Sequence, residues 1–265
     1  MQDALRGADL VFITCGLGGG TGSGASPVVA EIARDLGALT VAIVTKPFSF
    51  EGKQRGRIAD EALSTLKDRV DTLITIPNDK VLAVIDKKTT LLNAFEIVDD
   101  ILKHAVQGIS DLITYPGIVN VDFADIKAIM QESGPALIGI GRSSGENRAV
   151  EAAKMAINSP LLEIAVDGAR GVLFNISGGT DLGMLEVNEA AKVITDSVSS
   201  DAKIIFGAIN DQRLRKGELK VTVIATGFDD NNYRREPQNN FFEKQPAQSD
   251  QSNGSIPLKP SNEPK

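Results

Sequence analysis

The sequence predicts an α/β protein: a parallel sheet of the Rossmann type, then a long central helix, then a smaller α+β domain with a mixed sheet. Short apolar segments alternate with helix-periodic segments in the first part of the chain. A glycine-dense segment follows the first apolar segment, and one helix-periodic segment near the middle is unusually long. Continuous apolar strands separated by helices are typical of parallel sheets. At 265 residues, the chain can bury a substantial core.

The first part of the chain predicts three buried strands and two helices. The strands are expected at Leu10–Cys15, Leu39–Thr45 and Thr72–Ile76. The helices are expected at Pro27–Leu36, with Gly37 as a stop signal, and at Lys53–Val70. We expect the glycine-dense segment to form a loop between the first strand and the first helix.

The middle of the chain predicts one long helix over Thr90–Thr114. Apolar residues recur there every three or four positions and extend beyond a single face. A helix of this length spans about 36 Å. Because it is apolar on most sides, we expect it to be buried between two layers and to join two subdomains. Tyr115-Pro116-Gly117 is a turn signal that follows it.

The second part predicts the smaller α+β domain. Its strands are expected at Ala136–Gly141, Gly171–Ile176, Lys203–Ile209 and Lys220–Ala225, and its helices at Asp122–Glu132, Glu146–Asn158 and Val187–Val198. From about Asp229, proline, asparagine, glutamine and serine dominate, which predicts a disordered tail. The expected organisation is therefore a first domain at 1–113, a second domain at 114–228 and a tail at 229–265.

Composition and charge exclude several classes of function. With 28 Lys and Arg against 35 Asp and Glu, the formal charge is −7, whereas nucleic-acid binders usually carry a basic face. The single Cys15 rules out an internal disulfide and a multi-cysteine zinc site, and the single His104 argues against a Ser/His/Asp triad. The sequence has no apolar run of roughly 18 residues and no secretion signal, so we expect a cytoplasmic protein without membrane insertion.

The glycine-dense segment is the strongest functional signal. Six of the nine residues of Gly16–Gly24 are glycine, between a predicted strand and a predicted helix. Glycine allows a positive φ and lets a ligand approach backbone N–H groups closely, and the helix N-terminus adds partial positive charge. This arrangement predicts an anion site, most often for phosphate, rather than a plain strand–helix turn.

Two common phosphate-binding motifs do not fit this segment. A P-loop requires G-x-x-x-x-G-K-S/T, but the chain has no lysine between Leu5 and Lys46. A Rossmann fingerprint can be forced onto Gly20, Gly22 and Ala25, but the next strand then lacks the acidic residue that binds a ribose.

The sequence GGGTGSG at Gly18–Gly24 resembles the G-G-G-T-G/S-S/T-G signature of the tubulin/FtsZ family. Further segments are similar to the bacterial cell-division branch of that family: KPFSFEGKQR at Lys46–Arg55, TIPND at Thr75–Asp79, NVDFAD at Asn120–Asp125 and NISGGTDLGMLEV from Asn175. The match runs from residue 1 to about 228. It implies a tubulin-like GTPase that binds GTP or GDP with Mg²⁺. It also implies a protein that polymerises head to tail into the ring filament at the mid-cell division site.

The resemblance also implies which residues bind the nucleotide. In the glycine segment these are Gly18, Gly19, Gly20, Thr21 and Gly22. Glu51 and Arg55 match residues that reach the ribose and phosphate, although their spacing alone would make them a surface ion pair. Phe95 matches a side chain that stacks on the base, although by itself it is most simply a core residue.

Asp99, one helical turn after Phe95, is the predicted guanine-reading residue. A carboxylate on a helix that is apolar on most sides should have a partner. Guanine offers two parallel donors, N1–H and the 2-amino group, which suit one carboxylate, whereas adenine lacks this pair. Asp99 matches the acidic position of the family, and the neighbouring Asp100 is the alternative.

The NVDFAD segment contains the predicted catalytic residues Asn120, Asp122 and Asp125. N-capping and the helix dipole account for Asp122 and in part for Asn120, but less well for Asp125. In the family this segment is the synergy loop, which enters the nucleotide pocket of the next subunit, where its acids position the attacking water. The resemblance therefore implies catalysis in trans. It predicts no metal ligand from the protein, because Mg²⁺ is expected on phosphate oxygens and water.

Two alternatives stay open on the sequence. One is a nucleotide-binding filament protein without turnover, against which Asp122 and Asp125 argue. The other is a Rossmann-type NAD-dependent oxidoreductase. For partners, the resemblance implies a homopolymer, membrane tethers and division proteins such as FtsA, and no nucleic acid.

The chain departs from the family pattern at both ends. Family members begin with a strand and another glycine loop and reach the GGGTGSG segment much later, whereas here it begins at Gly18. The tail lacks an I-P-x-F-L-R-like tether motif, of which Ser255–Lys259 resembles a remnant. We therefore expect a fragment without the amino-terminal part of the GTP-binding domain. On its own, this fragment is expected neither to bind GTP tightly nor to polymerise.

Overall fold

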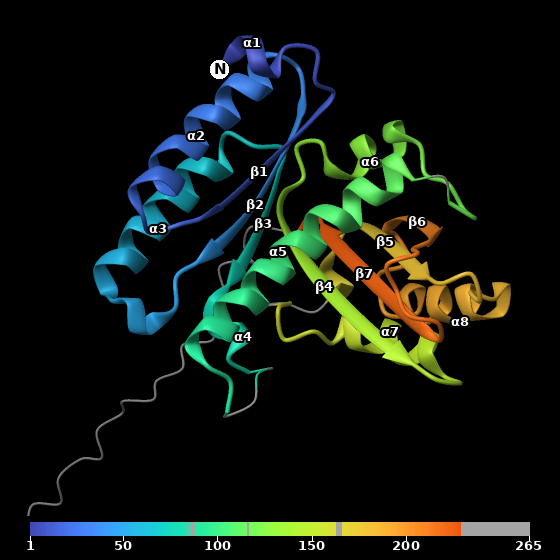
Figure 1. The fold of residues 1–265 in the computed structure, drawn as a ribbon. Helices are drawn as coiled ribbons and strands as arrows, with labels where there is room; N and C mark the ends of the chain where they lie inside the picture. The colour runs from blue at the N-terminus through green and yellow to red at the C-terminus, as the bar shows by residue number, and fades with distance from the viewer. Residues whose placement is uncertain (84, 86–87, 116, 163–165, 229–265) are drawn as a thin grey trace, which may run out of the picture. The chain divides into compact units, whose positions relative to one another are not determined.

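The computed structural model describes residues 1–228 except 84, 86–87, 116 and 163–165. The predicted tail at 229–265 and Pro116 of the predicted turn lie outside the described residues. The described part is drawn in colour in Figure 1.

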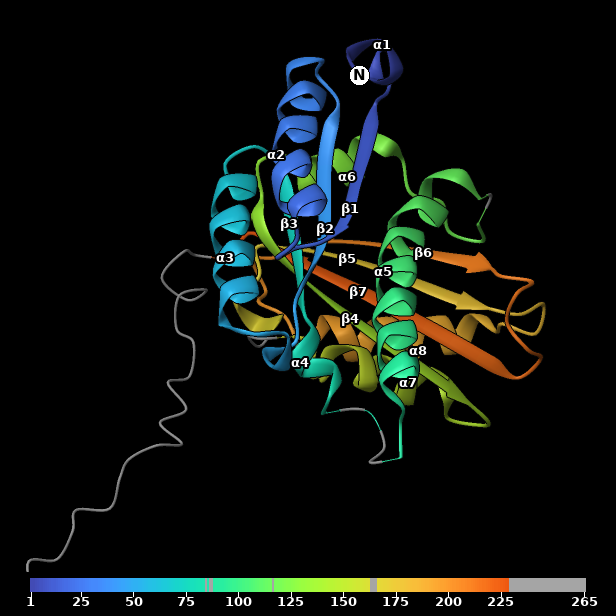
Figure 2. The same ribbon diagram turned by 60° about the vertical axis from the view of Figure 1, so that its left-hand side comes forward.

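Seven strands form one sheet in the order β1-β2-β3-β4-β7-β5-β6 (Figures 1 and 2). They are β1 (Leu10–Gly16), β2 (Leu39–Lys46), β3 (Thr72–Pro77), β4 (Gly134–Ser144), β5 (Gly171–Gly178), β6 (Lys203–Asn210) and β7 (Glu218–Thr226). Strands β1 to β4 are parallel, β7 is antiparallel to β4 and β5, and β6 is parallel to β5. The predicted α/β fold class is confirmed, and all seven predicted strands are present.

The separate sheets expected for the two parts of the chain are one continuous sheet. β3 and β4 join them through a short parallel register that pairs Thr72 with Gly134 and Ile74 with Ala136. The buried Asp71 carboxylate supports this junction, because it accepts hydrogen bonds from the backbone N–H of Thr40 (2.8 Å) and of Glu132 (3.3 Å). The division at residue 113 stays a prediction.

Helices cover both faces of this sheet. They are α1 (Gln2–Leu5), α2 (Gly20–Asp35), α3 (Lys53–Lys67), α4 (Asn78–Val81), α5 (Leu91–Thr114), α6 (Phe123–Met130), α7 (Arg148–Ile157) and α8 (Met184–Thr195), with 3-10 turns η1 (Ser49–Glu51) and η2 (Val166–Gly168). Alternation along the strands sends neighbouring side chains to opposite layers. In β2, Ala42 and Val44 pack in the cluster under α2 and α3, whereas Val41 and Ile43 pack in the cluster that includes α5 and α6.

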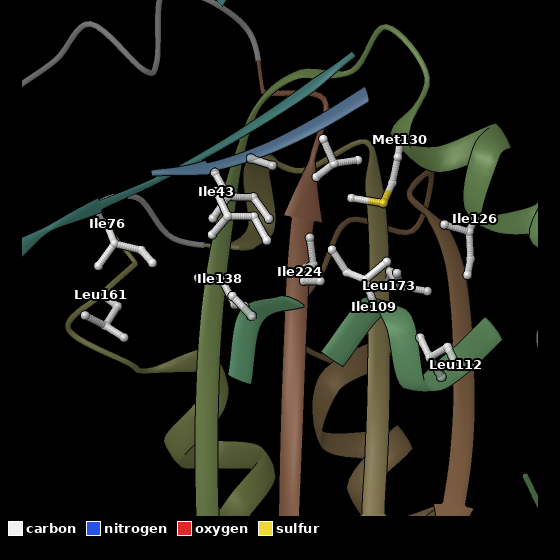
Figure 3. Close-up of a cluster of buried hydrophobic side chains, with 14 of the residues drawn as sticks. Ile43, Ile76, Ile109, Leu112, Ile126, Met130, Ile138, Leu161, Leu173 and Ile224 are labelled. Carbon is white, nitrogen blue, oxygen red and sulfur yellow. The ribbon is translucent and has the colours of Figure 1, made fainter. Parts of the chain in front are cut away.

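The cluster under α5 and α6 is shared by both parts of the chain. Figure 3 shows its side chains from the strands, such as Ile43, Ile138 and Leu173, facing Ile109 of α5 and Ile126 of α6. A third cluster packs α7 and α8 against the opposite face of β4, β5 and β7. A core that crosses the β3–β4 junction explains why the described residues form one compact unit.

The expectation that the long helix is buried between two layers is wrong. α5 has the predicted length, but only one face is buried, and its first turn is open, with Leu91 60% and Leu92 69% exposed. Apolar periodicity in a sequence indicates which residues favour burial, but not whether a second layer is there to cover them. The open face includes the predicted site residue Phe95.

The predicted start of the first helix is also wrong. α2 begins at Gly20 and not at Pro27, so half of the expected glycine loop is helical. Glycine has a low helix propensity, which led to the later start. Tertiary packing outweighs that propensity here, because Gly22 lies tightly against Gly16. In addition, the Gly22 carbonyl accepts a 2.5 Å hydrogen bond from Ser26 Oγ.

Candidate functional site

The candidate nucleotide site lies at the carboxyl edge of β1, β2 and β3. These three strands are parallel neighbours, so the segments that follow them meet at one edge of the sheet. Ligands in open α/β sheets bind beyond this edge. Figures 1 and 2 show the start of α2, the start of α3 and helix α4 following the three strands there.

The glycine segment makes a tight turn from β1 into α2. Gly18 has a φ of +96°, and a Cβ on it would lie 2.9 Å from the carbonyl oxygen of Arg55. The Leu17 N–H donates to the carbonyl of Thr45 at 2.9 Å, and the Gly18 N–H donates to Ser23 Oγ at 2.9 Å. The turn is therefore held against both β2 and the start of α3.

The free donors of this turn are the first N–H groups of α2. Gly20, Thr21 and Gly22 open the helix, so their N–H groups have no carbonyl partner within it. Gly19 is the N-cap and has no side chain to cover them, and a Cβ added at Gly19 or Gly20 would meet no atom within 4 Å. These groups can face an anion, whereas the Gly18 N–H is already engaged by Ser23.

Glu51 and Arg55 lie next to this turn. Glu51 Oε1 accepts a hydrogen bond from the Phe48 N–H at 2.8 Å, and Glu51 Oε2 pairs with Arg55. The Glu51 side chain is only 14% exposed, whereas that of Arg55 is 56% exposed. Glu51 is thus held by its own loop and by Arg55, and more than half of the Arg55 side chain stays exposed beside it.

An aromatic cluster brings the long helix to the same edge. Phe48, which is buried, stacks on Phe50 at 5.0 Å and meets Phe95 of α5 edge-on at 5.3 Å. Phe95 keeps 38% of its surface exposed. The predicted base-stacking residue therefore lies beside the loop that carries Glu51, with part of its ring open.

Asp99 lies one turn further along α5 and is exposed. The argument that this carboxylate needs a partner because of its burial is therefore wrong, and its role in reading guanine stays a prediction. Asp100 lines a cavity of about 660 Å³ between α5, β4 and the end of α7. His104, in which burial lowers the pKa, lines the same cavity, and Phe95 does not. Asp99 follows Phe95 by four residues and does not line this cavity, so it lies on the side of α5 that carries Phe95.

Sequence reasoning missed two buried polar residues at the end of β3. Among the described residues, Thr75 Oγ1 and Asn78 Oδ1 are buried without a hydrogen-bond partner. The next residue, Asp79, accepts hydrogen bonds from the backbone N–H and the hydroxyl of Ser49, which ties this turn to the loop after β2. The available signal was their place at the carboxyl end of a parallel strand, Thr75 within β3 and Asn78 directly after it. Unpaired oxygens at this edge can accept donors from a ligand.

The predicted catalytic segment follows the other end of α5. Asn120 Oδ1 accepts the Gly117 N–H at 2.7 Å, and Asp122 caps α6 by accepting the Ala124 N–H at 3.4 Å. Asp125 is exposed, and its carboxylate has no hydrogen-bond or ion-pair partner in the described part of the chain. Local hydrogen bonds and helix capping therefore account for Asn120 and Asp122, but they do not account for Asp125.

The chain does not bring the two groups of predicted site residues together. Figures 1 and 2 both show α4 and α6 at opposite ends of α5. The 24 residues of α5 correspond to about 36 Å of helix. Within one chain, Asn120, Asp122 and Asp125 are consequently far from the glycine turn.

Two family models match separate parts of the chain. Residues 1–86 match the model of the tubulin/FtsZ family GTPase domain, and residues 134–229 match that of the FtsZ family C-terminal domain. An FtsZ dimer from M. jannaschii is 47% identical, with a TM-score of 0.82 over 85% of this chain and 65% of that one. A point mutant of the same FtsZ is 48% identical, with a TM-score of 0.82 over 86% of this chain and 68% of that one.

The chain belongs to the tubulin/FtsZ family. It spans about two thirds of the length of the FtsZ structures that it matches. Helix α5 and the predicted catalytic segment lie between the two regions matched by the FtsZ family models. The GDP-bound monomer of CetZ1 from Haloferax volcanii shares the fold at 20% identity, with a TM-score of 0.67 over 84% of this chain and 66% of that one. Membership of this family excludes the alternative of a Rossmann-type NAD-dependent oxidoreductase.

Residues 1–228, outside the gaps named above, contain no group of three His, Cys, Asp or Glu side chains placed to hold a metal ion. In the same residues, no helix is long and apolar enough to cross a membrane.

Proposed function

We propose that this chain is the core of an FtsZ-type GTPase that assembles head to tail, with each nucleotide held between two subunits. The observation that supports this most strongly is the separation of the site into two ends of α5. One end has the first N–H groups of α2, Arg55 and Phe95, and the other has Asp125, whose carboxylate has no partner among the described residues. Neither end has all the groups that hydrolysis needs.

At the nucleotide end, we assign phosphate binding to the first N–H groups of α2. Helix N-termini favour anions through their free donors and dipole. To Arg55 we assign a contact with phosphate or ribose, to Glu51 the positioning of Arg55, and to Phe95 stacking on the base. Mg²⁺ would be held by phosphate oxygens and water, since the described residues offer no cluster of carboxylates for it. The ion would neutralise charge on the phosphates.

At the catalytic end, we assign the positioning of the attacking water to Asp125, assisted by Asn120 and Asp122. Phosphoryl transfer depends mainly on positioning and charge neutralisation. A contact between unlike ends repeats from subunit to subunit and builds an open filament. Each added subunit would then complete the site of its neighbour, so that hydrolysis follows assembly.

Replacement of Asp125 by alanine tests the assignment in trans. The experiment uses the 265-residue chain and a longer form preceded by the amino-terminal segment of an FtsZ. In the form that hydrolyses GTP, we expect Asp125→Ala to abolish turnover, measured as phosphate release, while GTP affinity changes by less than a few-fold. Asp201→Ala removes an exposed acid elsewhere and should leave both unchanged. A large loss of GTP affinity in the isolated Asp125→Ala subunit would contradict the assignment.

The alternative of a filament protein without turnover shares the same nucleotide end. The two functions differ in one measurement, because only the GTPase releases phosphate as light scattering rises after addition of GTP. Scattering without phosphate release in both forms would favour the alternative. In cells, we propose that the filament acts at the division site with membrane-tethering partners.

A further inference from the structure

Four charged side chains meet beneath the last turn of α5. Arg213, in the connection between β6 and β7, donates from Nη2 to Asp111 of α5 at 2.5 Å and from Nε to Asp211 at 2.7 Å. Lys220 of β7 lies 3.8 Å from Asp211. Two acids and two bases therefore balance within one cluster, although 102 positions of sequence separate Asp111 from Arg213.

Burial makes this cluster depend on Arg213. The side chains of Asp111 and Asp211 are 6% and 4% exposed. In the described residues, the Asp111 carboxylate has Arg213 as its one hydrogen-bonding partner. Burial alone would raise the pKa of Asp211, but hydrogen bonds from Arg213 hold it below its usual value. An unpaired carboxylate at such a position is costly, so the pairing is strongly constrained.

Arg213 also contacts the segment that leads to the predicted catalytic residues. Its guanidinium carbon lies 5.7 Å from the centre of the Tyr115 ring, in the first residue after α5. An arginine can bond two carboxylates in its plane and still present a face to an aromatic ring, which lysine cannot do. One side chain thus contacts both the last turn of α5 and the residue where the chain leaves it.

The other side of this segment is fixed by backbone contacts. The N–H groups of Ile118 and Val119 both donate to the carbonyl of Ala208 in β6, at 2.7 and 3.2 Å. A Cβ on Gly117 would lie 2.7 Å from the same carbonyl, so this approach is close. The start of the Asn120–Asp125 segment is therefore held between β6 and the Arg213 cluster.

We propose that Arg213 is a positioning residue that holds the end of α5 so that the Asn120–Asp125 segment leaves the subunit at a fixed angle. Its catalytic consequence rests on the function proposed above, because the segment acts on a neighbouring subunit. The positioning itself is a property of the single chain and can be measured without nucleotide.

Amide hydrogen exchange in the 265-residue chain tests the positioning. We expect Arg213→Gln to speed exchange at 117–125 by about tenfold or more, because the segment loses one of its two supports. Arg215→Gln removes the same charge from the same connection. The Arg215 side chain has no ion pair in the described residues, so this variant should leave exchange unchanged. Exchange in β2 corrects for any global loss of stability. Equal exchange at 117–125 in wild type and Arg213→Gln overturns the proposal.

GTP turnover tests the consequence in whichever form hydrolyses GTP. We expect Arg213→Gln to lower kcat about tenfold while GTP affinity stays within about twofold. Asp111→Asn removes one of the Arg213 bonds and should lower kcat in the same direction, and the double variant should be no worse than Arg213→Gln, because Arg213→Gln already removes that bond. Additive losses would contradict the pairing. If the wild type hydrolyses no GTP in any form, the proposed function fails, and the exchange experiment still decides the role of Arg213.

Discussion

At the scale of single residues, Gly22 is required by space and not by φ. A Cβ at this position would lie 2.2 Å from the carbonyl oxygen of Gly16 and 3.3 Å from the Cβ of Cys15. Gly22→Ala therefore forces the turn between β1 and α2 to open. We expect it to lower the free energy of unfolding by about 1–3 kcal/mol, as overpacking does, which urea denaturation can measure.

Gly24 offers a matched control for this prediction. It lies in the same helix, and a Cβ added there would meet nothing within 4 Å. Gly24→Ala should raise the free energy of unfolding by up to about 1 kcal/mol, because alanine favours helix. Equal destabilisation by the two substitutions would show that the contact with Gly16 is not the cause.

Asp99 and Asp100 can be separated by nucleotide selectivity. If Asp99 reads guanine, Asp99→Ala leaves two donors of the base unpaired and weakens GTP binding by about 1–3 kcal/mol. The affinity for inorganic triphosphate should change little, which titration calorimetry can measure in the form that binds GTP. Asp100→Ala is the control, because Asp100 lines the cavity on the side of α7. Equal weakening of GTP and triphosphate by Asp99→Ala would exclude a contact with the base.

At the scale of elements, Arg148 joins the starts of α7 and α8. Its side chain is 6% exposed and donates to Asp181 at 2.8 Å and to Glu186 at 2.6 Å. The hydrogen bonds from Arg148 are the main cause that lowers the pKa of both carboxyls. We expect Arg148→Met to lower the free energy of unfolding at pH 7 by about 2–3 kcal/mol, because hydrogen bonds to charged groups are lost.

The pH dependence of this difference follows from the lowered pKa values. Carboxyls with a lowered pKa contribute stability that is complete above their unfolded pKa, about 4, and is lost as the pH falls through the folded values. The difference between wild type and Arg148→Met should thus be constant from pH 7 to about 5 and shrink below about 4. Denaturation curves across this range provide the test. A difference that stays the same at pH 3 would mean that Arg148 acts through packing alone.

At the scale of the whole molecule, β1 is an edge strand. It pairs with β2 only, and no other described strand covers its outer side. Unpaired edges favour association with other chains. Thr14 is exposed on β1, so we expect Thr14→Lys to raise the concentration at which light scattering shows self-association. Thr65→Lys places the same charge on exposed α3 and should have no such effect. If both act alike, net charge and not the edge is responsible.

The sequence by itself determined the types of element and the family. Periodicity and apolar runs are local properties, so Leu10–Cys15, Leu39–Thr45 and Thr90–Thr114 were predicted within a few residues of their observed bounds. The segments GGGTGSG and NVDFAD likewise indicated the family without knowledge of contacts. For the site, the order of these segments placed the glycine turn directly after a parallel strand.

Only the tertiary structure decided which of these elements meet. It showed the junction of β3 with β4, the early start of α2 and the open face of α5. It also separated Phe95 from Asp125 by most of the length of α5 and paired Asp111 with Arg213. The physical reason is that burial and pairing depend on atoms brought together from distant positions. Local patterns state what each residue favours, and packing decides which preference is met.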